Sequence, residues 1–66
     1  MNDLKKLNTA ANEIFSLAMD QAMIVKSLIK ADSPGDQIKE AEDKLSTLTD
    51  AYSFILYRII SKIEEL

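Results

Sequence analysis

The sequence predicts an all-α protein, an antiparallel two-helix hairpin with its corner at Ser33-Pro34-Gly35. The only Gly and the only Pro among the 66 residues are neighbours at the midpoint of the chain. On both sides of them, apolar residues recur at alternating spacings of three and four, the period of one helix face. Helices joined by a corner of a few residues pack as antiparallel neighbours. We therefore expect one helical-hairpin domain over residues 1–66.

The first helix is predicted over residues 3–31. Lys26 and Lys30 suit its C-terminal end, where cations compensate the helix dipole. Beyond its main stripe, Phe15 and Met19 lie to one side and Leu17 to the other. The stripe has one polar member, Gln21, and consists of Leu4, Leu7, Ala11, Ile14, Ala18, Gln21, Val25 and Leu28.

Two local structures are compatible with the corner. Ser33 can act as N-cap, with Pro34 at the first helical position and Asp36 at the third, as in a variant of the capping box. A type II turn centred on Pro34-Gly35 is the alternative. Both place the reversal of the chain at the same point.

The second helix is predicted over residues 34–64, and its two halves differ. The first half is amphipathic, whereas "YSFILYRII" (residues 52–60) has only Ser53 and Arg58 as polar residues. Phe54 projects almost opposite the main stripe, and Tyr57 and Ile60 lie on one shoulder. The stripe consists of Ile38, Ala41, Leu45, Leu48, Tyr52, Ile55 and Ile59.

The apolar residues exceed what one interhelical contact covers. In an antiparallel hairpin, residues 52–60 lie beside residues 9–17, so the excess gathers at the end far from the corner. A contiguous apolar patch on a protein surface generally marks a contact site. The alternative is that Phe54 and Tyr57 are buried in the core of a homodimer and have no function beyond assembly. The predicted partner-binding residues are Phe15, Leu17, Phe54, Tyr57 and Ile60.

Composition argues against several function classes. The chain has no Cys and no His, and no base stands near Ser33, so we expect no enzyme activity and no cofactor. Glu40 and Asp43 lack further ligands and are expected to be a solvated helix face, not a metal site. The net charge is −3 and the basic residues form no stripe, which disfavours nucleic-acid binding. No apolar run has the length of a membrane span, and the first residues lack a signal-peptide core, so a cytoplasmic location is expected.

Two features resemble a known family, the small co-chaperones of type III secretion needle subunits. One is the mid-chain corner Pro34-Gly35-Asp36, and the other is the run Ile55-Leu56-Tyr57-Arg58, aliphatic residues that end in a tyrosine and a base. The resemblance covers the whole length in layout, although the first helix supplies no matching motif. It implies a helical hairpin of similar size.

The resemblance also implies a function. Members of this family pair with a larger helical chaperone of tetratricopeptide type, and the heterodimer keeps a needle subunit soluble in the bacterial cytoplasm before export. Only the corner and residues 55–58 carry over from the family. The rival hypothesis is a homodimeric four-helix bundle, as in small plasmid or phage regulators. A weak homodimer that exchanges for a heterodimer is compatible with both.

Overall fold

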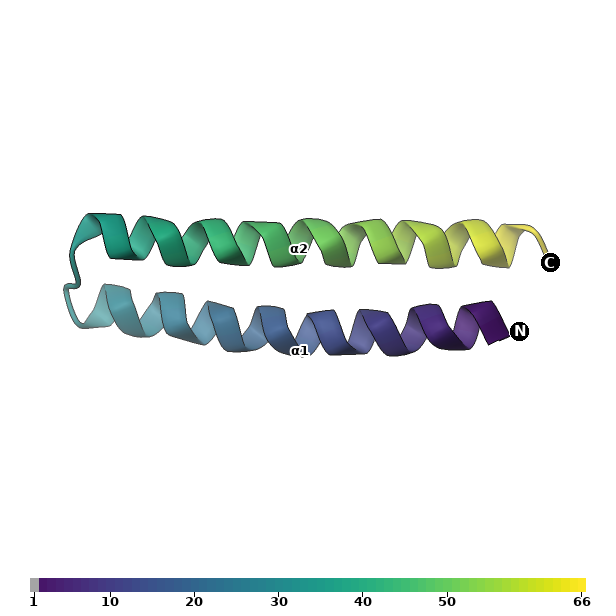
Figure 1. The fold of residues 1–66 in the computed structure, drawn as a ribbon, viewed down its shortest axis with the longest axis horizontal. Helices are drawn as coiled ribbons and strands as arrows, with labels where there is room; N and C mark the ends of the chain where they lie inside the picture. Colours follow the sequence, from purple (N-terminus) through teal and green to yellow (C-terminus); the bar gives the residue numbers. More distant parts are fainter. Residues whose placement is uncertain (1) are drawn as a thin grey trace.

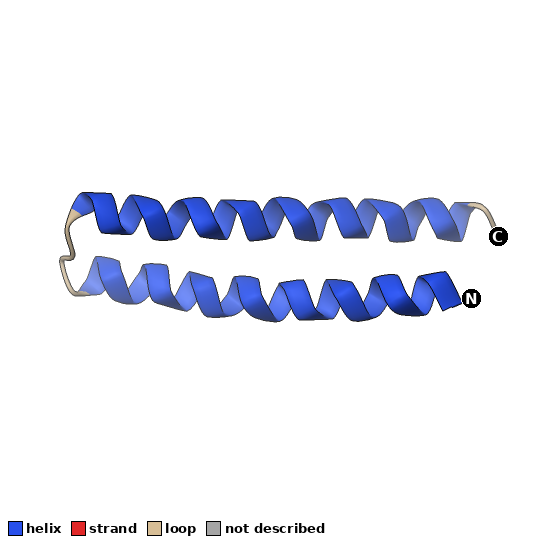
Figure 2. Ribbon diagram, in the orientation of Figure 1, coloured by secondary structure: helices blue, strands red, loops and turns tan. Residues whose placement is uncertain are grey.

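The protein is a hairpin of two antiparallel helices, which confirms the predicted fold class (Figures 1 and 2). The computed structural model describes residues 2–66, so Met1, the first residue of the predicted domain, lies outside the described residues. Helix α1 spans Asn2–Lys30 and helix α2 spans Gly35–Glu64. The hairpin is a rod of 50 × 14 × 11 Å. The start of α1 and the end of α2 lie together, opposite the turn (Figure 1).

A single seam joins the two helices, and the predicted stripes form it. Every residue of both stripes is buried or half-buried, whereas most other residues are exposed. The rings of Phe15 and Tyr52 lie 5.6 Å apart, centroid to centroid. This contact confirms that the segment around residue 15 lies beside the start of residues 52–60.

Small side chains make up the most buried part of the seam. Among the described residues, the only buried hydrophobic ones are Ala11, Val25 and Ala41, and none of them is large. Gln21, the polar member of the first stripe, donates a hydrogen bond from Nε2 to the carbonyl oxygen of Ala41 at 3.0 Å. A polar group in a helical seam fixes the alignment of the helices at some cost in stability. Gln21 therefore ties α1 to α2 in one register.

The turn is made by the end of α1 and depends on Asp32. Asp32 has a positive φ of 54°, the left-handed conformation that usually ends a helix. Its N–H donates to the carbonyl of Ile29 at 3.1 Å, and the N–H of Ser33 donates to the carbonyl of Leu28 at 3.0 Å. These two bonds form a Schellman motif, which satisfies carbonyls that the helix end would otherwise leave free.

This motif corrects the predicted corner. Ser33 is not the N-cap, because its N–H closes α1 instead. Pro34 is the N-cap and makes no side-chain cap bond, and its carbonyl accepts from Gln37 and Ile38 at 3.0 and 3.2 Å. Gly35 is the first residue of α2 and has no positive φ, so the type II turn is also wrong. The sole Gly thus lies beside the reversal and does not produce it.

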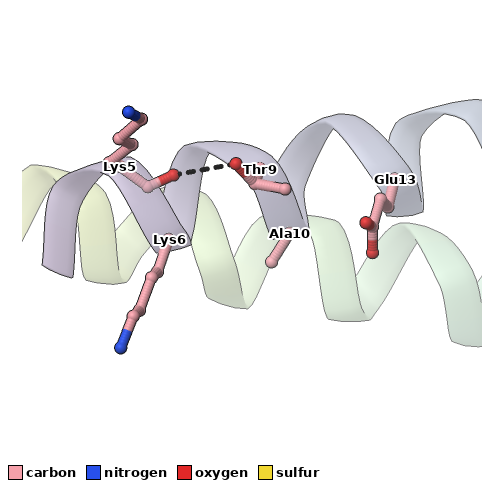
Figure 3. Close-up of a pocket in the computed structure, with 5 residues that line it drawn as sticks. All are labelled: Lys5, Lys6, Thr9, Ala10 and Glu13. Atoms are coloured by element: carbon pink, nitrogen blue, oxygen red, sulfur yellow. Dashed lines mark hydrogen bonds between the residues drawn. The ribbon is translucent and has the colours of Figure 1, made fainter. Parts of the chain in front are cut away.

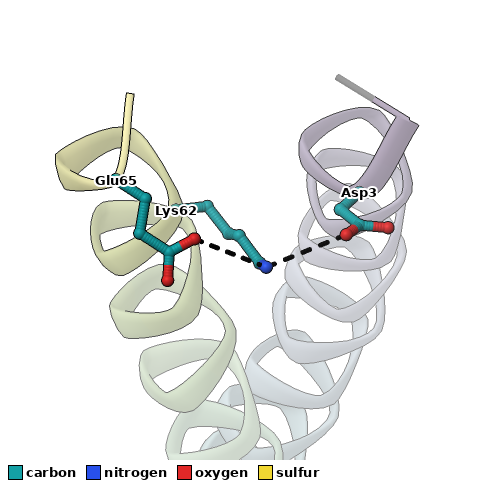
Figure 4. Close-up of polar contacts among 3 residues, drawn as sticks. All are labelled: Asp3, Lys62 and Glu65. Atoms are coloured by element: carbon teal, nitrogen blue, oxygen red, sulfur yellow. Dashed lines mark ion pairs between the residues drawn. The ribbon is translucent and has the colours of Figure 1, made fainter.

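The open end of the hairpin is closed by a charge cluster. Lys62 follows Ile59 at the same spacing as the second stripe, and its Nζ lies 3.8 Å from Oδ2 of Asp3 and 3.6 Å from Oε2 of Glu65 (Figure 4). The carboxylates are well exposed, and exposed ion pairs contribute at most about 1 kcal/mol. The cluster therefore aligns the two ends more than it stabilises them.

The turn geometry generates the first prediction. Asp32→Gly should raise the free energy of unfolding by about 0.5–1 kcal/mol, because glycine adopts positive φ without a steric cost. Asp32→Val should lower it, since a β-branched residue is strained there. Gly35→Ala should be neutral or stabilising by up to about 1 kcal/mol, because nothing lies within 4 Å of the added Cβ. Urea denaturation followed by circular dichroism measures all three, and a destabilised Asp32→Gly variant would contradict the assignment.

Candidate partner-binding surface

Much of the apolar content of this protein lies on its surface. Among the described residues, the three buried hydrophobic ones are two alanines and a valine, while twelve large hydrophobic side chains are exposed. Scattered exposed hydrophobics are ordinary, but a surplus this large relative to the core indicates a contact surface. The exposed large side chains are Phe15, Leu17, Met19, Met23, Ile24, Ile29, Phe54, Leu56, Tyr57, Ile60, Ile63 and Leu66.

The two flanks of the hairpin, on either side of the seam, differ in chemistry. Helix residues seven apart share a face, and residues two apart point in nearly opposite directions. Two grooves between the helices both open on one flank. Asp3, Lys6, Leu7, Arg58 and Lys62 line the first. Gln21, Ile24, Gln37, Glu40, Ala41 and Lys44 line the second.

We call this side the mixed flank, because charged residues dominate it. Leu17 belongs to it, since it lies seven residues before Ile24. Phe54 lies on the same side at i−4 from Arg58, and the Arg58 guanidinium carbon stands 5.9 Å from the centre of its ring. This geometry is a cation–π contact. The aromatic face of Phe54 is therefore already paired within the chain.

The opposite side, which we call the apolar flank, carries apolar side chains of α2 toward the open end and of α1 toward the turn. Phe15 lies two residues from Leu17, and Leu56 two residues from Arg58, so both point away from the mixed flank. Positions seven residues further along the same faces are Ala22, Ile29 and Ile63. The apolar flank comprises Phe15, Met19, Ala22 and Ile29 of α1 with Leu56, Ile60 and Ile63 of α2; all but the half-buried Ala22 are exposed.

The structure distributes the five predicted partner-binding residues over three sides. All of them are 51–68 % exposed. Phe15 and Ile60 lie on the apolar flank, and Leu17 and Phe54 on the mixed flank. Tyr57 projects from the back of α2, farthest from the seam. The prediction grouped them by height along the rod, which is not enough to place them on one surface.

Five members of the apolar flank were not among the predicted partner-binding residues: Met19, Ala22, Ile29, Leu56 and Ile63. The signal that reveals most of them is a seven-residue spacing, which links Ala22 and Ile29 to Phe15, and Ile63 to Leu56. This spacing can be used only once the seam residues are known. Each of these residues directly follows a seam residue, or lies seven residues from one that does. Ile29 also shows that the flank extends to the turn and is not confined to the open end.

Polar side chains do not converge into a reactive site on the described part of the chain. A shallow depression lies on α1 and is lined by Lys5, Lys6, Thr9, Ala10 and Glu13. Figure 3 shows the Lys5 and Lys6 side chains extending away from one another. The Thr9 hydroxyl donates to the carbonyl of Lys5 at 3.0 Å, a bond within the helix. Among residues 2–66, no three acidic side chains gather as metal ligands.

Comparison with protein-family models, with curated proteins and with solved structures found no match. The resemblance to needle-subunit co-chaperones therefore stays a prediction based on the residues quoted above. Within the described residues, neither helix has the length and apolar content that a membrane crossing requires.

The thin seam generates the second prediction. The isolated chain should be helical but only marginally stable, with a melting midpoint at or below the roughly 45–65 °C of mesophilic domains. Binding of any protein to the folded hairpin should raise this midpoint by mass action. Circular dichroism melts combined with sedimentation equilibrium test this. A monomer at micromolar concentration that melts sharply above about 70 °C would show that the seam alone suffices.

Proposed function

We propose that this protein is a non-enzymatic co-chaperone that binds and stabilises a larger helical chaperone of tetratricopeptide type. In this proposal the larger chaperone keeps a type III secretion needle subunit soluble in the bacterial cytoplasm before export. The apolar flank is the observation that carries the proposal, because it is an extended contact surface on a chain with few buried residues. A partner that covers it would supply the apolar burial that the hairpin lacks.

The shape of the flank favours a helical partner. Exposed side chains at heptad spacings form a ridge on each helix, toward the open end on α2 and toward the turn on α1, and the ridges of another helix can pack against them. Helix-on-helix packing would place Phe15 and Ile60 at the contact, with Leu56 and Ile63 beside them. The larger chaperone of the proposal offers helices for such packing.

The family-like run Ile55-Leu56-Tyr57-Arg58 gains a structural meaning in this proposal. Successive helix residues are 100° apart, so the four residues point to four sides of α2. Ile55 faces the seam, Leu56 the apolar flank, Tyr57 the back and Arg58 the mixed flank. A partner on the apolar flank would contact Leu56, with Tyr57 at the margin, while Ile55 holds the hairpin together.

A matched pair of double variants tests the docking side, and this is the third prediction. Phe15→Ala with Ile60→Ala removes one aromatic and one aliphatic side chain from the apolar flank. Leu17→Ala with Phe54→Ala removes the same types from the mixed flank. Truncating a buried aromatic anchor typically costs at least about 2 kcal/mol, roughly thirtyfold in Kd. The first variant should therefore bind the partner chaperone at least thirtyfold more weakly, and the second almost normally, in a calorimetric titration.

Leu45→Ala is the control for stability. Leu45 lies on the seam and is half-buried, so its truncation should lower the free energy of unfolding by about 1–2 kcal/mol, less than for a fully buried leucine. It should change the Kd for the partner little once the variant is folded. Equal weakening by both double variants would refute the assignment to one flank. The absence of a larger helical partner among proteins co-purified from the native organism would refute the proposed function itself.

A further inference from the structure

The apolar flank carries a charge opposite to that of the protein as a whole. The chain has a net charge of −3, with eleven acidic and eight basic residues. Three lysines border the flank: Lys5 and Lys26, which share a face with Met19 at multiples of seven, and Lys39, which shares a face with Ile60. Glu42, fourteen residues before Leu56, is the only carboxylate on that side. The flank is thus net positive while the remainder is strongly negative.

These lysines are available to a partner. Lys5, Lys26 and Lys39 are exposed, and in the described part of the chain the only side-chain ion pairs involve Lys62. Lys5 lies near the open end, and Lys26 and Lys39 lie near the turn, one on each helix. Phe15, Met19, Ala22 and Leu56 lie between these lysines along the rod, and Ile29, Ile60 and Ile63 lie beside or beyond them. An occupant therefore meets cations near both ends of a largely hydrophobic strip.

The charge pattern disfavours a second copy as the occupant. If two flanks met in a parallel two-fold pairing, α1 of each copy would face α2 of the other, and Lys26 would face Lys39. In the antiparallel pairing, Lys5 would face Lys26 and Lys39 of the other copy, with Glu42 as the single compensating group. Like charges brought together across an interface are repulsive and suppress that pairing. A symmetric dimer through this flank would therefore leave an uncompensated positive charge at both ends.

We infer that the natural occupant of the apolar flank is an amphipathic helix of another protein with carboxylates beside its apolar stripe at both ends. Glu or Asp at those positions would pair with Lys5 at one end and with Lys26 and Lys39 at the other. This inference rests on the proposed function and specifies the chemistry of the partner surface. The three lysines would make the flank selective among helical partners, because a basic or neutral helix would leave three cations unpaired.

The dimensions of the flank set the length of the occupant. Lys5 and Lys26 are separated by 21 residues of α1, about 32 Å at 1.5 Å per residue. The face of the hairpin is 50 Å long and 14 Å wide, about 700 Å², close to the roughly 800 Å² per partner of a standard interface. A partner helix that reaches both Lys5 and Lys26 must span this distance of about 32 Å, which takes at least about 22 residues.

Two synthetic helices test this inference as the fourth prediction. Each is about 28 residues long with the same leucine stripe. One carries Glu beside the stripe at both ends, and the other carries Lys there. Fluorescence anisotropy with the full-length protein should show the acidic peptide binding about tenfold more tightly at low salt, as expected for three exposed ion pairs. Added salt should reduce the ratio.

Charge reversal separates local from overall electrostatics. Lys5→Glu with Lys26→Glu and Lys39→Glu should invert the preference between the peptides. Lys6→Glu with Lys30→Glu and Lys44→Glu makes the same change in net charge outside the flank, and should leave the preference in place. The net charge of −3 already repels the acidic peptide, so tighter binding of that peptide supports a local effect.

Three results would overturn the inference. One is equal affinity for the two peptides, or no binding of either. Another is inversion of the preference by the control variant. The third is a stable homodimer that Phe15→Ala with Ile60→Ala dissociates, because a second copy would then cover the flank. If the natural partner still requires Phe15 and Ile60 while the peptides show no preference, the proposed function stands and the charge inference alone fails.

Discussion

Two helices packed side by side can bury only one stripe each, and this constraint governs the rest of the molecule. The seam is formed by the apolar residues that alternate at spacings of three and four on both helices. The side chains on the far side of each helix remain uncovered. Its most buried residues include Ala11 and Ala41, whose small side chains contribute little buried area. The described part of the hairpin therefore has a thin core, while twelve of its large apolar side chains are exposed. Both the marginal stability that we predict and the partner binding that we propose follow from this shortage of burial.

The seam could be predicted from the sequence because the spacing of apolar residues within each helix determines which face that helix packs against the other. Every predicted seam residue, including the polar Gln21, is at least half-buried. Gln21 is an instructive case, since its position is explained by periodicity but its partner is not. The hydrogen bond to the carbonyl of Ala41 depends on the alignment of the two helices, which follows from the turn and the packing together.

The turn was harder to predict, because glycine and proline are strong signals that here mark the wrong residues. Gly35 lies in the first turn of α2 and needs no glycine-specific conformation, whereas Asp32 adopts the left-handed one. Asp is among the few residues other than glycine that tolerate this backbone conformation. Because position 32 is not a glycine, the sequence did not clearly mark it as the residue that ends α1. Pro34 retains the expected function in a different position, because its fixed φ and lack of an N–H suit the residue that precedes the first helical turn.

The five residues predicted to bind a partner do not share one side of the rod, for a geometric reason. Height along the rod brings Phe15, Leu17 and Phe54 to one end, but the side on which each lies depends on its angle around the helix axis. In both helices of this antiparallel pair, a residue that directly follows a stripe position falls on the apolar flank, and a residue that directly precedes one falls on the mixed flank. Separating the flanks therefore requires both the seam and the direction of the chain in each helix.

That separation changes what the surface can do. If all the exposed hydrophobic side chains acted as one surface, the hairpin would aggregate or dimerise without selectivity. Divided between two flanks, they describe one apolar strip bordered by Lys5, Lys26 and Lys39, and one strip where Phe54 is paired with Arg58 among charged neighbours. Placing nearly all carboxylates away from the apolar strip keeps the protein acidic overall while its contact surface is basic. This arrangement discourages self-pairing through the strip and favours a partner of opposite charge, so that a chain with little core can remain available for that partner.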